Sequence, residues 1–315
     1  MSSILITGGF GLLGGRIARH LSANGSQVIL GSRFKKEVPD WLETAEVQQM
    51  NWNDLSQLSA ICDNVDIIVH SAGMSAEECA ENPLAAFEFN TLGTMKLIEA
   101  SKKSKKVKKF IYLSTVHVYK SPLEGLISEE TCPNNLHPYA SSHRSAEFGV
   151  LYANSAKVFR GYNLRLSNGF GAPTHPDVKC WKLLVNDLCR QAVENGVIKL
   201  NSTGIQKRDF IPIKNITSII GKLVLKENDG ASGLLNVGSG TGMTILEMSH
   251  QIQKRCHVLF GYTPELKVPK SEINETEKVF EYSIDRLRSL SLAEFCNIDE
   301  ELDELLLFCK KTLVE

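Results

Sequence analysis

A glycine-rich turn close to the start of the sequence constrains the fold more than any other feature. An apolar strand at residues 4–6 leads into Thr7-Gly8-Gly9-Phe10-Gly11-Leu12-Leu13-Gly14, and a helical pattern continues from Leu12 to Asn24. Glycines permit a tight turn and let backbone N–H groups approach a ligand closely, while the N-terminus of the helix stabilises negative charge. A turn placed in this way between a strand and a helix is typical of a cradle for a dinucleotide pyrophosphate.

The first half of the sequence alternates short apolar runs with helical patterns. Strands are predicted at residues 4–6, 28–30, 65–69, 110–113 and 162–166, and helices at 12–24, 83–101 and 139–155. Such alternation predicts βαβ units, a parallel sheet and right-handed crossovers. Beyond about residue 168 the alternation becomes irregular, although residues 234–237 predict one more strand and the acidic tail from residue 260 is partly helical.

These patterns together predict an α/β fold with a doubly wound parallel sheet. We expect residues 1–168 to form a dinucleotide-binding Rossmann domain, completed by a returning strand near 234–237. Residues 169–315 are then mainly a smaller C-terminal substrate-binding region. A chain of 315 residues can bury a large core without disulfides or a structural metal.

The charge balance disfavours several classes of partner. Lysine and arginine total 35 and the acidic residues 36, so no overall field attracts nucleic acid. No apolar run approaches the roughly 18 residues that a membrane span requires, and the N-terminus lacks the segments of a signal peptide. We therefore expect a cytoplasmic protein without nucleic-acid or membrane partners. The lysine-rich run at 102–109 is interpreted as a solvated helix end rather than an anion-binding patch.

The eight cysteines show no metal-binding or redox pattern. None forms a Cys-x-x-Cys pair, and no short Cys/His cluster has zinc spacing, so we predict no metal site. We expect reduced, mostly buried thiols. The cysteines are Cys62, Cys79, Cys132, Cys180, Cys189, Cys256, Cys296 and Cys309.

A series of motifs, in their order along the chain, resembles the extended short-chain dehydrogenase/reductases, and in particular their nucleotide-sugar epimerases, dehydratases and ketoreductases. The resemblance covers residues 4 to about 240 and implies a nicotinamide cofactor and a nucleotide-sugar substrate. The motifs are Gly8-x-x-Gly11-x-x-Gly14, His70-Ser71-Ala72-Gly73, Asn90-x-x-Gly93-Thr94, Ser114-Thr115-x-x-Val118-Tyr119, Pro138-Tyr139-x-x-Ser142, Arg165-x-x-Asn168-Gly169-Phe170-Gly171 and Arg208-Asp209-Phe210.

The resemblance also implies which residues hold the cofactor. Asn90 would support the site, and Asn51 and Trp52 would contact the adenine. The full set is Gly8, Phe10, Gly11, Leu12, Leu13, Gly14, Ser32, Arg33, Asn51, Trp52, Ser71, Ala72, Gly73, Asn90, Tyr139 and His143.

The end of the second predicted strand indicates which nicotinamide cofactor is bound. An acidic residue there would bind the adenosine ribose hydroxyls and select NAD, but the strand ends Leu30-Gly31-Ser32-Arg33. Ser32 can donate a hydrogen bond to a 2′-phosphate, and Arg33 can pair with it through its guanidinium fork. Lys35 and Lys36 add further positive charge. These residues favour NADP(H), with NAD as the alternative.

The catalytic segment departs from the family pattern at one position. By resemblance, Tyr139 is the general acid/base, Thr115 binds the same substrate oxygen, and a lysine four residues after the tyrosine lowers its pKa. Here that position is His143, on the same helical face. A protonated His143 could supply the missing charge, although an unperturbed histidine is mostly neutral at pH 7. Either His143 replaces the lysine, or the chain is a catalytically degenerate dinucleotide-binding protein.

The residues after Thr115 narrow the reaction. By resemblance, dehydratases of this family have the sequence Thr-Asp-Glu at this segment. Here Val116 and His117 follow Thr115, which disfavours dehydration. His117 takes the position that faces the substrate in the family, where it could titrate a carbon acid next to a ketone; otherwise it is a strand-end histidine with a structural hydrogen bond. The substrate-binding residues implied by the resemblance are Thr115, Asn168, Lys179 and Arg208.

An NADP(H) site favours net reduction, because NADPH is the cellular reductant. The sequence therefore predicts an NADP(H)-dependent oxidoreductase that reduces a 4-keto group on a nucleotide-linked sugar, with or without epimerisation. A C4-epimerase with bound NAD is the alternative enzyme. The resemblance also implies a homodimer through the helices at 83–101 and 139–155. Their apolar residues are Leu84, Phe87, Leu92, Met95, Leu97, Phe148, Val150 and Leu151.

Overall fold

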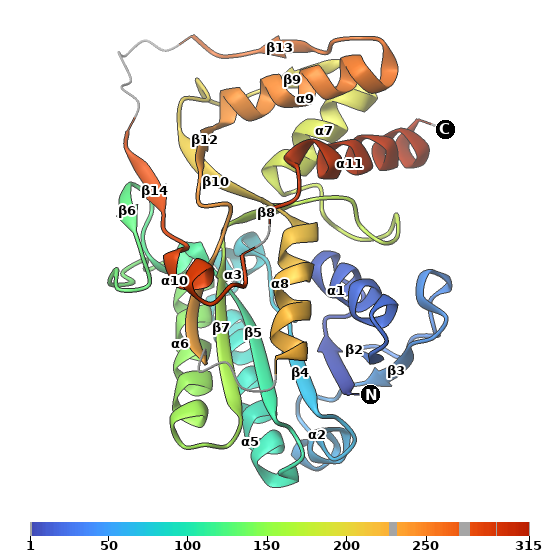
Figure 1. Cartoon of the computed structure of the whole chain (residues 1–315), viewed down its shortest axis with the longest axis vertical. Coiled ribbons are helices and arrows are strands. Elements are labelled where there is room, and N and C mark those ends of the chain that lie inside the picture. The colour runs from blue at the N-terminus through green and yellow to red at the C-terminus, as the bar shows by residue number, and fades with distance from the viewer. Residues whose placement is uncertain (1, 227–231, 271–277, 294, 315) are drawn as a thin grey trace.

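A seven-stranded parallel sheet forms the centre of the molecule (Figure 1). The structure is a computed structural model that describes residues 2–226, 232–270, 278–293 and 295–314. The strand order is β11-β7-β5-β4-β1-β2-β3, so the chain starts near the middle and winds outward in both directions. The strands are β1 (Ser3–Thr7), β2 (Gln27–Ser32), β3 (Glu46–Gln49), β4 (Ile67–His70), β5 (Lys109–Thr115), β7 (Arg160–Leu166) and β11 (Gly233–Val237). The predicted doubly wound α/β fold is thus confirmed.

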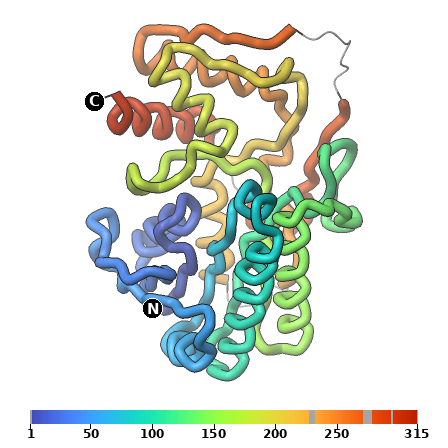
Figure 2. The backbone as a smooth tube through the Cα atoms, turned by 180° about the vertical axis from the view of Figure 1, so that it is seen from behind, coloured from blue at the N-terminus to red at the C-terminus, as the bar shows by residue number. Residues whose placement is uncertain are grey.

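Helices cover both faces of this sheet. One face packs against α1 (Leu12–Ala23) and α8 (Ile213–Leu225), and the other against α2 (Leu55–Cys62), α5 (Thr94–Ser104) and α6 (Pro138–Ser155). Figure 2 shows α5 and α6 side by side on the second face.

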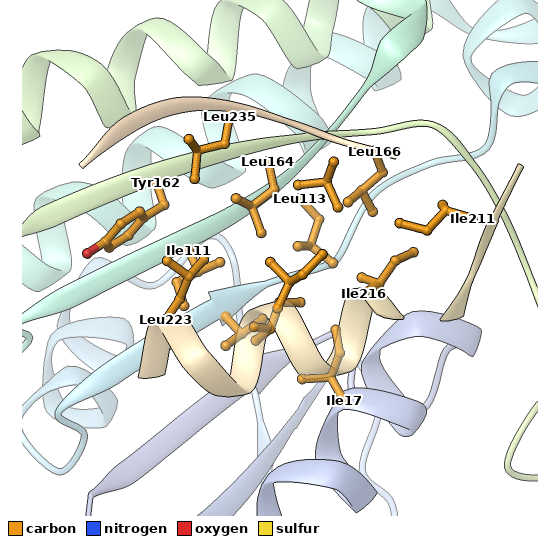
Figure 3. Packing of buried hydrophobic residues seen from close by; sticks show 14 of the residues in the cluster. Ile17, Ile111, Leu113, Tyr162, Leu164, Leu166, Ile211, Ile216, Leu223 and Leu235 are labelled. Carbon is orange, nitrogen blue, oxygen red and sulfur yellow. The ribbon is translucent and has the colours of Figure 1, made fainter. Parts of the chain in front are cut away.

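The period-two geometry of a strand sends alternate side chains into the two cores. Ile111 and Leu113 pack with α8 residues in one core, as Figure 3 shows, while Phe110 and Tyr112 pack in the other. The consequence is that Tyr112 lies on the side of the sheet that α5 and α6 cover.

The remainder of the chain forms a third core beyond the carboxyl ends of the sheet. It contains α7 (Leu184–Asn195), α9 (Ile245–Phe260) and α11 (Ile298–Leu313). Beside it, β8 (Asn168–Phe170), β10 (Lys207–Pro212) and β12 (Gly242–Thr244) form a small mixed sheet.

Smaller elements complete the described chain. Two further parallel pairs join β9 (Val197–Lys199) to β13 (Glu265–Lys267), and β6 (Gly125–Ile127) to β14 (Phe280–Tyr282). The short helices are η1 (Asp40–Leu42), α3 (Ala76–Glu81), α4 (Pro83–Ala86), η2 (Phe87–Gly93), η3 (Val116–Val118) and α10 (Asp285–Ser289).

The elements differ from the sequence prediction in informative places. Strand β3 was not predicted, because Glu46–Gln49 is a polar edge strand without an apolar run. The helix predicted at 83–101 is a succession of α4, the π-helical η2 and α5. Helix α8 was missed as well, although it packs beside α1 on one face of the seven-stranded sheet. This sheet therefore takes both α8 and β11 from the chain beyond residue 168.

Candidate active site

The glycine turn joins β1 to α1 in a closed loop. The backbone N–H of Gly11 donates to Gly8 O at 2.9 Å, and that of Gly15 donates to Gly11 O at 2.9 Å. Gly8 has a φ of +66°, which L side chains rarely adopt. A Cβ on Gly14 would lie 2.2 Å from Gly8 O, so only glycine lets α1 start this close to the turn. The loop leaves the N-terminus of α1 free to face a ligand.

A cavity of about 250 Å³ opens between this loop and the carboxyl ends of β2 and β4. Its lining includes the predicted cofactor residues Gly8, Phe10, Gly11, Ser32, Arg33, Trp52, Ser71, Ala72 and Gly73. The lining also includes four residues that the sequence analysis missed: Gly31, Phe34, Met50 and Phe89. Each of the four is adjacent in the sequence to a predicted cofactor residue, and Phe89 reaches the cavity from η2.

Arg33 is the only charged residue among those described as lining the cavity. Its guanidinium carbon lies 5.5 Å from the ring centroid of Phe34 and 5.1 Å from that of Phe89. Within the described ranges no carboxylate forms an ion pair with it. The cavity thus has an unneutralised cation at the end of β2, where an anionic group would be stabilised.

Several predicted cofactor residues lie outside the cavity lining. Leu12 and Leu13 pack half-buried against the core under α1. Asn51 is exposed and accepts a hydrogen bond from the N–H of Asn53 at 3.0 Å. Asn90 is buried; it accepts from the N–H of Met74 at 2.9 Å and donates to Ser142 Oγ at 3.0 Å. Asn90 therefore ties the turn after β4 to α6, which is a supporting position.

Thr115 and Tyr139 meet at the carboxyl end of β5. Tyr139 lies in the first turn of α6, where the His137 side chain accepts from its N–H at 3.2 Å. Burial raises the pKa of Tyr139, and a side-chain hydrogen bond with Thr115 partly opposes that rise. The structure therefore brings together the two residues predicted to bind one substrate oxygen.

His143 lies one turn further along α6, with its ring centroid 4.6 Å from that of Tyr139. Its Nδ1 is 2.7 Å from the Tyr112 hydroxyl. Burial lowers the pKa of His143 to about 4, so the ring is neutral at pH 7. Of the two alternatives for His143, burial disfavours the protonated form that could replace the lysine, because desolvation penalises the charged imidazole.

His117, predicted to be catalytic, lies near Arg208, one of the predicted substrate residues. His117 is exposed to solvent; desolvation lowers its pKa, and the nearby charges of Arg208 and His137 lower it further. Arg208 is half-buried on β10, and desolvation lowers its pKa; no carboxylate in the described part of the chain pairs with it. Asn168 donates to Asp209 O at 2.9 Å and so joins β8 to β10.

Lys179 lies near the short helix α3. Hydrogen bonds from Ser75 lower the pKa of Glu78 on α3, and the charges of Arg33 and Lys179 lower it further. The charge of Lys179 is thus close enough to α3 to act on Glu78, whereas the sequence predicted that Lys179 binds the substrate.

Arg165, which belongs to a motif of the substrate side, is instead part of the scaffold. Its Nε and Nη2 donate to the two carboxylate oxygens of Glu147 at 2.9 and 2.6 Å, and both side chains are buried. Ser114 Oγ donates to the same carboxylate at 2.5 Å. This ion pair joins β7 to α6, and the Ser114 hydrogen bond adds β5.

Comparison with known proteins identifies the family of this chain. A sequence model described as the NAD dependent epimerase/dehydratase family matches residues 4–238. The chain belongs to the NAD-dependent epimerase/dehydratase family. This confirms the resemblance on which the sequence analysis relied.

The relatives of this family member are distant. A dTDP-D-glucose 4,6-dehydratase of Mus musculus is 24% identical over 90% of this chain and 78% of its own length. A dTDP-glucose 4,6-dehydratase of Streptomyces niveus is also 24% identical, over 90% of this chain and 84% of its own. Among solved structures, the UDP-glucose 4-epimerase of Thermotoga maritima with UDP-glucose superposes with a TM-score of 0.80 at 21% identity, covering 99% of each chain.

The described residues show neither a membrane-spanning helix nor a metal-binding cluster. Their helices are all too short or too polar to cross a membrane. Within the same residues, no cluster of three or more His, Cys, Asp or Glu side chains is arranged to hold a metal ion.

Proposed function

We propose that this member of the family is an NADP(H)-dependent oxidoreductase that reduces a 4-keto group on a nucleotide-linked sugar, with or without epimerisation. The observation that carries the proposal is the proximity of Thr115 and Tyr139, next to His143 and to a glycine-lined cavity in which Arg33 is the one charged residue among the described lining. A general acid and a cofactor cavity in this arrangement are what carbonyl reduction requires.

The residues of the cavity fit a dinucleotide. The glycine turn and the N-terminus of α1 would hold the pyrophosphate, and Ser32 with Arg33 would hold a 2′-phosphate. A Cβ on Gly8 would lie 3.0 Å from the backbone of Ala72, so a side chain would close the cradle. When bound, the nicotinamide supplies the hydride.

The chain's own residues supply the proton. Tyr139 donates its hydroxyl proton to the substrate oxygen as the carbonyl is reduced, and Thr115 orients that oxygen by a hydrogen bond. Burial keeps the pKa of Tyr139 raised, which suits a proton donor better than a base. Arg208, half-buried and without a carboxylate partner in the described residues, would bind the diphosphate of the nucleotide sugar. The names of the relatives, which include nucleotide-sugar dehydratases and epimerases, support this substrate class.

The test is NADPH oxidation by the purified protein with a panel of 4-keto nucleotide sugars. We expect turnover that depends on Tyr139 and exceeds turnover with NADH. If no 4-keto sugar is reduced but a nucleotide sugar is interconverted at C4 by protein that retains NAD after purification, the C4-epimerase is the correct assignment.

A second candidate is a dinucleotide-binding protein without turnover. The observation that favours it is the neutral His143, because Tyr139 then has no adjacent imidazolium to stabilise a phenolate. Wild type would then be inert while His143→Lys gains activity. Retained wild-type activity contradicts this candidate.

The exposed apolar side chains of η2 and α6 support the predicted homodimer. Leu92 and Phe148 are 52% and 57% exposed, and the two helices pack against each other. Leu97 and Val150, from the same predicted set, are buried and belong to the core. We infer that a second copy covers this face.

A further inference from the structure

Two buried histidines flank Tyr112 behind the candidate active site. The ring centroids of His70 and His143 lie 5.6 and 5.8 Å from that of Tyr112. His70 is 2% and His143 6% exposed, so each ring nitrogen needs a partner inside the protein or in a bound ligand. The two histidines differ in how many of their ring nitrogens have a hydrogen-bond partner in the described residues.

The hydrogen bonds of His70 are complete. Its Nδ1 lies 2.6 Å from Thr7 Oγ1 and its Nε2 2.9 Å from Thr94 Oγ1. Thr94 donates its only hydroxyl hydrogen to Asn90 O at 2.6 Å, so it accepts from His70. His70 therefore carries its hydrogen on Nε2, and Thr7 donates to its Nδ1.

The hydrogen bonds of His143 are incomplete. Its Nδ1 has one partner, the Tyr112 hydroxyl at 2.7 Å, and that hydroxyl has no other hydrogen-bond partner within the described residues. A phenol has a single hydrogen, and a buried O–H without an acceptor is costly. Tyr112 therefore donates to Nδ1, which requires the hydrogen of the neutral imidazole to be on Nε2.

This Nε2–H is directed toward the cofactor cavity. A Cβ built on Gly73, which lines the cavity, would lie 3.7 Å from both Cε1 and Nε2 of His143. No described residue accepts a hydrogen bond from Nε2. The free donor of a nine-tenths buried side chain thus faces the place where a ligand would bind.

We propose that Tyr112 is a positioning residue that fixes His143 as a neutral Nε2–H donor, and that this donor binds an oxygen of the dinucleotide held in the cavity. The part of this proposal that concerns the dinucleotide rests on the proposed function. A neutral donor differs from an ammonium group, because it holds the ligand by direction rather than by charge. The proposal also explains why a buried histidine is tolerated here, since the ligand satisfies its last nitrogen.

The test uses the full chain with ¹⁵N-labelled histidine side chains. Long-range ¹H–¹⁵N correlation spectra report the tautomer of each of the eight histidines, and His143→Gln assigns the resonance. We expect the Nε2–H form in the free protein, with Nδ1 shifted as a hydrogen-bond acceptor. In Tyr112→Phe that Nδ1 shift should be lost, while His70 stays in the Nε2–H form. An Nδ1–H or charged His143 at neutral pH would overturn the proposal.

Ligand binding tests the second half. NADPH or NADH should move the Nε2 resonance of His143, and Tyr112→Phe should weaken binding by about 2- to 10-fold, the range for one net hydrogen bond. Tyr119→Phe is the matched control, since the hydroxyl of this buried tyrosine donates to Asn236 Oδ1 at 2.6 Å instead. Equal losses in the two variants would reduce Tyr112 to a structural role. If wild type binds neither dinucleotide, the proposed function and the ligand half fail together, whereas the spectra of the free protein still decide the tautomer.

Discussion

Arg33 is the residue that we propose selects the nicotinamide cofactor. It lines the cavity at the end of β2, where no other described lining residue is charged. Arg33→Asp places a carboxylate near the ribose and removes the phosphate partner. We expect NADPH affinity to fall about tenfold or more, as loss of a charge-assisted bond implies, while NADH affinity holds or rises. Titration of both cofactors measures this, with Lys103→Ala, exposed on α5, as control. Wild type that binds NADH more tightly than NADPH would contradict the assignment.

Tyr139 carries the proton transfer in the proposed reaction. Tyr139→Phe keeps the ring that contacts His143 but removes the hydroxyl that meets Thr115. Turnover should fall by about 10²-fold or more, the scale of lost acid–base assistance, while NADPH binding stays nearly intact. Steady-state NADPH oxidation and a cofactor titration on the same variant separate the two effects. Wild-type turnover in Tyr139→Phe would remove this tyrosine from the mechanism.

The two buried histidines make stability depend on pH. Burial lowers the pKa of His70 to about 3 and that of His143 to about 4, so the unfolded state binds more protons than the folded state below about pH 6.5. The free energy of unfolding should therefore fall as the pH drops through this range, by up to about 1.4 kcal/mol per pH unit for each histidine. Urea denaturation between about pH 7 and pH 5 measures the slope.

Single substitutions identify the source of that slope. His143→Gln should make it shallower by up to the contribution of one proton. The exposed His250→Gln is the control. An unchanged slope in His143→Gln would mean that His143 is protonated in the folded protein near neutral pH.

At the scale of elements, the junction of β1 and α1 depends on the absence of a side chain at Gly14. An added Cβ would meet Gly8 O at 2.2 Å, and neither backbone can move without displacing the turn. Gly14→Ala should destabilise the fold by about 1–3 kcal/mol and abolish dinucleotide binding. Thermal unfolding and a cofactor titration check both effects. Gly93→Ala, whose Cβ would lie 3.6 Å from Trp52, is the matched control and should bind normally.

At the scale of the whole molecule, the exposed apolar face of α4, η2 and α6 predicts association. Leu84, Leu92, Phe148 and Tyr152 are 71%, 52%, 57% and 76% exposed on packed neighbouring helices. Light scattering should give twice the chain mass of 34.9 kDa. Leu92→Glu should yield monomers, because burying a carboxylate in an apolar interface is costly. Val258→Glu, 59% exposed on α9, should leave the mass unchanged. A monomer in wild type at micromolar concentration would refute the dimer.

Features set by neighbouring residues were predictable from the sequence. The strand, glycine turn and helix at the start of the chain need only local backbone geometry, and they indicated the fold, the family and much of the cavity lining. Strand β3 escaped prediction because Glu46–Gln49 pairs only along one edge of β2 and has no apolar pattern. The motif that begins at Arg165 did not reveal that Glu147, on another element, neutralises this arginine.

The sequence by itself determined the doubly wound sheet, its glycine turn and the identity of the residues at the ends of its strands, because periodicity and glycine spacing are local properties. Only the tertiary structure decided the protonation of those residues. His143 looked like a potential cation in the sequence; inside the protein it is neutral, because α6 buries it against Tyr112 and burial penalises its charged form. Whether a side chain is charged depends on what surrounds it in space, and that information is distributed over β4, β5 and α6 rather than written at one position.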